Sequence, residues 1–137
     1  MMRHIFLLLP LLLLSFMIKG QVGTPIANDI GTDAISVKVL KTVFLGNKSL
    51  WSNGTKVTVV LTASDSENFE STAQWALGTD AFEYQKHWLS LVFQGRTNAP
   101  VLLSDENEVI EYVAKHPGAI GLLYSNSSPK ELEIEVK

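Results

Sequence analysis

Apolar residues recur along the chain in two kinds of run, some at helical spacing and others nearly continuous and rich in β-branched residues. Helical spacing gives a helix one buried face, whereas a short, continuous β-branched run is typical of a buried strand. The pattern predicts helices at residues 36–44, 67–77, 80–93 and 105–115. It predicts strands at residues 56–61, 100–103, 119–124 and 131–137, and permits one at 22–27.

Local signals support these boundaries. Ser36, Asp80 and either Ser104 or Asp105 are good helix caps, and glycines follow several of the helices. The segment Trp51–Gly54 has the composition of a turn. Helices interleaved with short apolar strands indicate an α/β fold with a small sheet flanked by helices. We find no internal repeat and no linker that would divide the chain, so one domain is expected at residues 21–137.

The helical patterns also predict which side chains are buried. Aromatic residues at helical spacing usually pack in a core, so we expect core positions for Trp75, Phe82, Trp88 and Phe93. In the last helix the apolar residues are expected to face inward, and three glutamates, Glu106, Glu108 and Glu111, are expected to face outward.

The first twenty residues differ from the rest. Arg3 precedes the apolar run Ile5–Ile18, which as a helix is about 21 Å long at ~1.5 Å per residue. The hydrocarbon core of a bilayer is about 30 Å thick. A charged start, a short apolar middle and Gly20 therefore predict a secretory signal peptide at residues 1–20. The alternative is an uncleaved anchor, because Lys19 lies where a cleavage region prefers small neutral residues.

Composition restricts the functional classes. The chain has no cysteine, which excludes disulfides, thiolate metal sites and a cysteine nucleophile. Export without cysteine favours a bacterial periplasm over a eukaryotic secretory route. The formal charge of −3 becomes −5 when Arg3 and Lys19 leave with the signal, with nine basic against fourteen acidic side chains remaining. A net negative charge gives no support for a nucleic-acid partner.

No pattern of catalytic or metal-binding residues is found. His87 and His116 lack a carboxylate at ligand spacing, so we expect neither a metal nor a cofactor. Glu70, Asp80 and Glu83 are interpreted as solvated helix positions, and no nucleophile elbow or phosphate-cradling loop is present. The sequence therefore predicts a protein that is not an enzyme.

Two features are candidates for binding an anion. The loop after the strand at 56–61 contains Thr62, Ser64, Ser66 and Asn68, whose hydroxyls and nearby backbone N–H groups could hold an oxyanion at a helix start. The alternative is ordinary helix capping, and Asp65 and Glu67 would repel an anion. Arg96 follows a helix end, where it is either an exposed loop cation or an anion contact.

Three stretches in order resemble a known family: FLGNKSLWSNGTKVTVV (44–60), HWLSLVFQGRTNAP (87–100) and EVIEYVAKHPGAIGLL (108–123). They are similar to the phosphate-binding-protein-like domain of the periplasmic solute-binding proteins that serve phosphate ABC transporters, especially short, single-lobe members. The resemblance implies a single lobe of the type II periplasmic-binding-protein fold. It also implies a role in phosphate or other oxyanion uptake or sensing in the periplasm.

The sequence departs from this family at the expected binding loop. The family's second lobe has an arginine before a Ser-Gly-Thr at a helix start, whereas the corresponding loop here, residues 61–67, has no arginine and carries two carboxylates. We therefore keep a second hypothesis beside oxyanion binding. In it, a single lobe has lost solute binding and serves as an interaction module that docks to a protein partner of the cell envelope.

Overall fold

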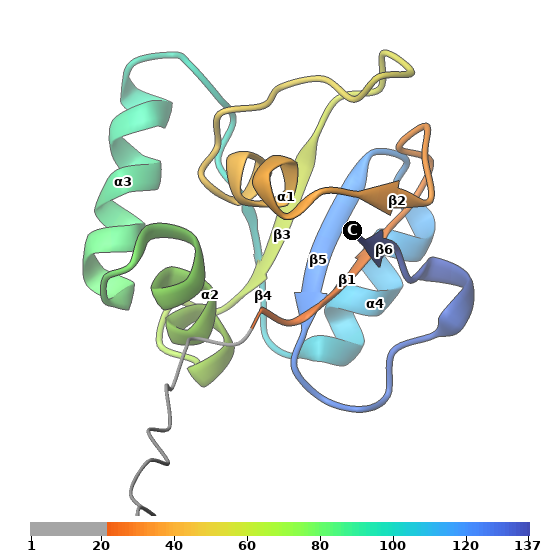
Figure 1. Ribbon diagram of the computed structural model, residues 1–137. Coiled ribbons are helices and arrows are strands. Elements are labelled where there is room, and N and C mark those ends of the chain that lie inside the picture. The colour runs from red at the N-terminus through yellow and green to blue at the C-terminus, as the bar shows by residue number, and fades with distance from the viewer. Residues whose placement is uncertain (1–21) are drawn as a thin grey trace, which may run out of the picture.

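The computed structural model describes residues 22–137 (Figure 1). The predicted signal peptide at residues 1–20 lies outside the described residues. Within the described part of the chain, no helix has the length and hydropathy needed to cross a membrane.

A four-stranded mixed sheet forms the centre of the fold, with the order β1-β5-β3-β4. Its strands are β1 (Thr24–Ala27), β3 (Thr58–Thr62), β4 (Val101–Leu103) and β5 (Ala119–Leu123). Strand β3 pairs in parallel with both β4 and β5, while β1 runs antiparallel to β5. The three parallel strands therefore end at one edge of the sheet, and this edge positions the candidate site.

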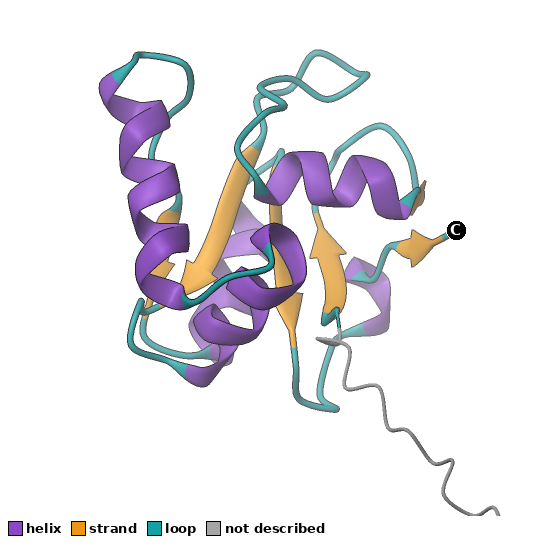
Figure 2. Cartoon of the chain, turned by 60° about the vertical axis from the view of Figure 1, so that its left-hand side comes forward, coloured by secondary structure: helices purple, strands orange, loops and turns teal. Residues whose placement is uncertain are grey.

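Four helices cover the sheet on both faces, as Figures 1 and 2 show. They are α1 (Val37–Phe44), α2 (Glu67–Leu77), α3 (Ala81–Phe93) and α4 (Glu106–Lys115). Each begins at a side chain that accepts a hydrogen bond from the backbone N–H three residues later, at Ser36, Ser66, Asp80 and Asp105. The structure thus confirms a small mixed sheet flanked by helices.

The core has two parts because neighbouring strand residues point to opposite faces of the sheet. Val59, Leu61 and Ile120 pack with residues of α1, α2 and α3. Val60 and Leu123 pack with the buried face of α4 instead. Strands β3 and β5 are therefore covered on both faces, which explains why their sequences are continuously apolar rather than alternating.

The prediction that Phe82 and Phe93 belong to the core is wrong. Their side chains are 63% and 85% exposed. The buried face of α3 is formed by Tyr84, Trp88 and Leu91, so that the prediction for Trp88 is confirmed. The helix is fixed in this orientation by Tyr84, whose hydroxyl donates to the carbonyl oxygen of Phe44 at 2.5 Å. Burial raises the pKa of this hydroxyl above its ordinary value.

The predicted strand at 131–137 is also wrong for most of its length. Residues Lys130–Leu132 form a short 3-10 helix, and only Glu135–Val136 (β6) is a strand. It pairs in parallel with β2 (Ala34–Ile35), a strand that the sequence pattern did not predict. A strand of two residues is too short to show an alternation of apolar and polar positions. Its position depends instead on where the chain meets the strand with which it pairs.

Candidate functional site

The candidate site lies where β3, β4 and β5 end. In open α/β sheets, ligands bind outside the carboxyl ends of parallel strands. Three segments meet there: the loop from β3 to α2, the loop from β4 to α4, and the chain that leaves β5 at Tyr124. The predicted residues Thr62, Ser64, Ser66 and Asn68 belong to the first of these segments, or to the strand end and helix start beside it.

The hydroxyl groups of this loop bond to one another and to the helix. The Thr62 and Ser66 hydroxyl oxygens are 2.6 Å apart, and Ser66 Oγ also accepts the backbone N–H of Phe69 at 3.1 Å. Ser66 is therefore the cap of α2, as the capping interpretation proposed. Ser64 instead lines a separate cavity of about 310 Å³ with Leu102 and Glu108.

Asn68 makes the contact that links the segments. Its side-chain Nδ2 donates to Glu106 Oε2 at 2.6 Å, across 38 residues of sequence. The same oxygen accepts the backbone N–H of Tyr124 at 2.6 Å. The other oxygen, Oε1, accepts the backbone N–H of Ser125 at 3.2 Å and its hydroxyl at 2.5 Å. Four donors from two segments thus converge on one carboxylate.

This arrangement corrects the prediction that Glu106 faces outward. Its side chain is half-buried and turned toward the end of β5. The sequence shows a glutamate in the first turn of a helix, where a carboxylate is common because of the helix dipole. What it does not show is that Asn68 and the β5 end lie beside that turn, since this depends on the order of strands in the sheet.

Tyr124 fixes the end of β5 against α2. Its hydroxyl and that of Thr72 are 3.0 Å apart. Burial raises the pKa of the Tyr124 hydroxyl, an effect that the hydrogen bond with Thr72 partly opposes. The backbone N–H groups at residues 124 and 125 are therefore held in place by packing and by a half-buried hydrogen bond.

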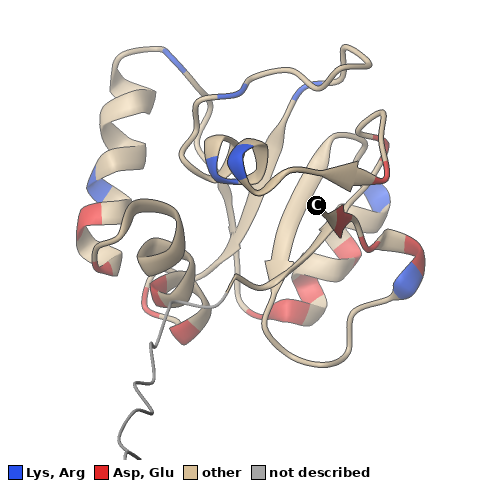
Figure 3. Cartoon of the chain, viewed as in Figure 1, with Lys and Arg blue, Asp and Glu red and all other residues tan. Residues whose placement is uncertain are grey.

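Charge at this edge is negative. A cavity of about 570 Å³ opens beside Glu106, lined by Glu67, Asn68, Asp105, Glu106, Asn107, Tyr124, Ser125 and Ser127. Neither this cavity nor the one beside Ser64 is lined by a described lysine or arginine. Figure 3 shows acidic residues gathered around the starts of α2 and α4, and several basic residues toward the opposite end of the sheet.

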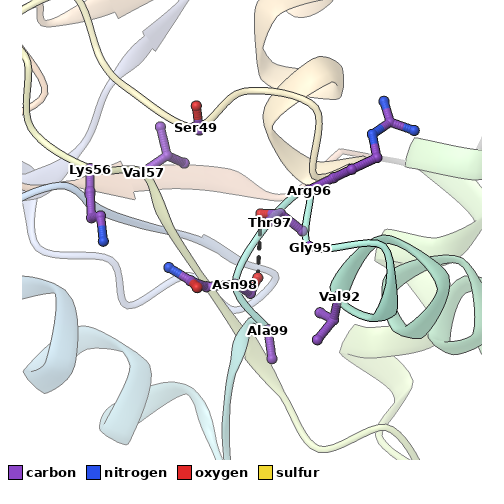
Figure 4. A pocket seen from close by; sticks show the side chains of 9 residues that line it. All are labelled: Ser49, Lys56, Val57, Val92, Gly95, Arg96, Thr97, Asn98 and Ala99. Carbon is purple, nitrogen blue, oxygen red and sulfur yellow. Dashed lines mark hydrogen bonds between the residues drawn. The ribbon is translucent and has the colours of Figure 1, made fainter.

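At that opposite end, a cavity of about 420 Å³ is lined by residues that include Lys56, Arg96 and Asn98 (Figure 4). The guanidinium of Arg96 points away from both Lys56 and Asn98, so the two cations do not converge on one point. Arg96 is exposed, which agrees with its interpretation as a loop cation.

The other candidate residues serve local structure. Among the described residues, no group of three or more His, Asp or Glu side chains is arranged to hold a metal ion. His87 is hydrogen bonded to the carbonyl oxygen of Leu45 at 2.7 Å, and the ring of His116 stacks on Tyr112.

The three carboxylates considered for acid/base chemistry lie near the start of α3. Asp80 caps this helix, Glu70 accepts the backbone N–H of Ala81 at 2.7 Å, and Glu83 pairs with Lys86 at 3.6 Å. Asp80 and Glu70 are therefore capping groups rather than simply solvated ones.

These features define the class of the fold: an α/β domain with a small mixed sheet whose parallel strands end at a common edge. Neither a family model nor a curated protein matches the chain. Among solved structures, the chain is similar to an ABC-type phosphate transport receptor from Vibrio cholerae, with a TM-score of 0.52 and 13% identity. The match covers 84% of this chain and 46% of the receptor, so this chain spans about half of the receptor's length. At this identity the likeness shows the fold alone.

Proposed function

We propose that this chain is a non-enzymatic binding module with the fold of a solute-binding lobe, and that it recognises a basic segment of a protein partner in the bacterial periplasm. The recognition surface is the edge where β3, β4 and β5 end. The observation that supports this proposal is the acidic lining of that edge, with no described lysine or arginine in either cavity.

The charges at the edge favour a cationic partner over a free phosphate. Asp65 and Glu67 are exposed beside the start of α2, and Asp105 and Glu108 lie at the start of α4. A cleft lined by one sign of charge attracts the opposite sign and repels its own. Phosphate carries negative charge and would meet this repulsion without a guanidinium or ammonium to offset it.

An apolar contact is available at the same edge. The side chain of Leu102 on β4 is 47% exposed and lines the smaller cavity beside Ser64 and Glu108. Protein interfaces combine a desolvated apolar centre with a polar rim. A partner segment with lysine or arginine flanking an apolar residue fits this combination.

The setting of the proposed interaction follows from two separate arguments. The signal peptide predicted for residues 1–20 supports export to the periplasm. The likeness in fold to a phosphate transport receptor supports phosphate uptake or sensing as the process in which the partner acts. In this proposal the chain contributes to that process through a protein contact rather than by carrying the ion.

The test is an affinity capture from a periplasmic extract with three versions of the chain as bait. One is the wild type, one is Asp65→Lys/Glu67→Lys at the edge, and one is the matched control Asp33→Lys/Glu135→Lys beside the small β2–β6 sheet. All four positions are exposed, so both variants reverse the same charge without burying it. Circular dichroism verifies that each bait is folded.

We expect a partner that the wild type and the control recover equally and that the edge variant loses. Its capture is expected to weaken with added salt, because exposed charges are screened beyond about 8 Å at physiological ionic strength. Equal recovery by the edge variant and the control, or recovery of no protein by the wild type, would contradict the proposal.

A further inference from the structure

We propose that Glu106 is an intramolecular ligand, and that its carboxylate fills a small oxyanion site built by Asn68, Tyr124 and Ser125. The domain would then have an oxyanion site that its own side chain keeps closed. The donors are one side-chain amide, two backbone N–H groups and one hydroxyl, at 2.5 to 3.2 Å from the two carboxylate oxygens.

The contacts of Glu106 differ from those of a capping residue. Glu108, two residues later, shows the ordinary pattern, because its Oε2 accepts the backbone N–H of Ser104 just before its own helix, at 2.7 Å. None of the hydrogen bonds to the Glu106 side chain comes from α4. All its donors lie on α2 and at the end of β5, 18 to 38 residues away in sequence.

The donor set specifies the chemistry of the ligand. A carboxylate has two oxygens and only accepts hydrogen bonds, and here each oxygen receives two. Hydrogen bonds to an ionised acceptor are shorter and stronger than neutral ones. The site therefore suits a small carboxylate such as formate or acetate, and a tetrahedral oxyanion such as phosphate can present two oxygens in the same way.

There is room for such a molecule. The cavity of about 570 Å³ opens directly beside Glu106, and Asn68, Tyr124 and Ser125 all line it. Removal of the Glu106 carboxylate would leave four donors without their acceptor, of which those of Asn68 and Tyr124 are half-buried and those of Ser125 are exposed. The half-buried donors left unpaired destabilise the fold, and a free anion of the same chemistry would restore their bonds.

Neighbouring charge explains why the site would hold an attached carboxylate better than a free one. Glu67 and Asp105 line the same cavity and repel an incoming anion. A tethered side chain has a high effective concentration that overcomes this repulsion, whereas a free ion does not. We therefore expect binding of free oxyanions only after Glu106 is removed, and then weakly.

The test is chemical rescue of Glu106→Ala. Thermal unfolding is measured for the wild type and the variant in sodium chloride and in sodium acetate, formate or phosphate at equal ionic strength and neutral pH. We expect the variant to have a lower Tm than the wild type in chloride, and to recover part of the loss in acetate or formate. If the variant is unfolded in chloride, its refolding on addition of acetate, followed by tryptophan fluorescence, gives the same information.

Three controls separate a specific site from a general effect of salt. The wild type is expected to show no acetate-dependent gain, because its site is filled. The double variant Asn68→Ala/Glu106→Ala lacks one donor and is expected to be rescued less. Glu106→Gln keeps a side chain in the site, so it is expected to lose stability without rescue. Equal gains in acetate for the wild type and Glu106→Ala would overturn the proposal, as would an unchanged Tm on substitution.

NMR chemical shifts identify the residues that acetate contacts in the variant. In Glu106→Ala, acetate is expected to shift the backbone amide signals of Tyr124 and Ser125 and the side-chain amide of Asn68, and to leave distant amides unchanged. Shifts spread over the whole protein, or absent from these three groups, would contradict the site. This inference concerns the edge used in the proposed function, but its test needs no partner, so failure of either one leaves the other standing.

Discussion

Gly118 and Gly121 stand at positions where a side chain has no room. Gly118 has φ +88°, and an added Cβ would lie 2.1 Å from the backbone oxygen of Lys56. Its own carbonyl oxygen accepts the indole N–H of Trp51 at 2.9 Å. At Gly121, an added Cβ would lie 2.8 Å from a methyl group of Val109 on α4. A side chain at either position would clash with its neighbours, which explains why glycine occurs twice in the segment PGAIG (117–121), where the chain enters β5.

We expect Gly118→Ala to lower the free energy of unfolding by about 3 kcal/mol or more, since a left-handed conformation and a backbone clash are combined. Gly54→Ala is the matched control, because Gly54 has φ +84° but nothing within 4 Å of an added Cβ. It should cost only about 1–2 kcal/mol. Urea unfolding followed by tryptophan fluorescence measures both. Equal costs for the two variants would show that the close approach at Gly118 is unimportant.

Helix α3 shows where the sequence pattern is insufficient at the scale of an element. Its thirteen residues include apolar side chains on nearly every side, so helical spacing alone does not select one face. The buried face is chosen by contacts from other elements, such as the ring of Phe69, whose centroid lies 5.4 Å from that of Tyr84. Phe82 and Phe93 remain exposed as a consequence.

This orientation is tested by two substitutions on opposite faces of α3. Phe93→Ser is expected to change the free energy of unfolding by less than about 0.5 kcal/mol, because the side chain is 85% exposed. Trp88→Ala removes a side chain that is only 5% exposed and should cost about 3–5 kcal/mol. Chemical denaturation of both variants provides the comparison. A large loss for Phe93→Ser would mean that this residue is packed in solution.

The elements that local sequence determines could be predicted, and those that depend on distant partners could not. The four helices and strands β3, β4 and β5 follow from caps, glycines and apolar runs within each segment, whereas the pattern only permits β1. Strands β2 and β6 exist only because they meet each other across a hundred residues. Likewise, the sequence indicates Thr62, Ser64, Ser66 and Asn68 as polar groups at a strand end, but the contact between Asn68 and Glu106 requires the order of strands in the sheet.

At the scale of the whole molecule, the fold supports the position of the candidate site, and the charge distribution supports its preference for a cationic partner. The fold of the chain is similar to that of about half of a phosphate transport receptor, and its parallel strands end at the edge where open α/β sheets bind ligands. That edge carries carboxylates, while Arg96, Lys56 and Lys48 belong to cavities at the other end. The charged residues are thus unevenly distributed, and the candidate site lies at the negative end (Figure 3).

The central claim is that this edge is closed to free phosphate in the wild-type protein. Isothermal titration of residues 21–137 with inorganic phosphate at neutral pH tests it most directly. Glu106 already occupies the hydrogen-bond donors, and other carboxylates surround them. We therefore predict no saturable heat up to about 1 mM phosphate, which corresponds to a binding free energy weaker than about −4.1 kcal/mol. Saturable binding of one phosphate with a Kd near 1 μM would contradict the account.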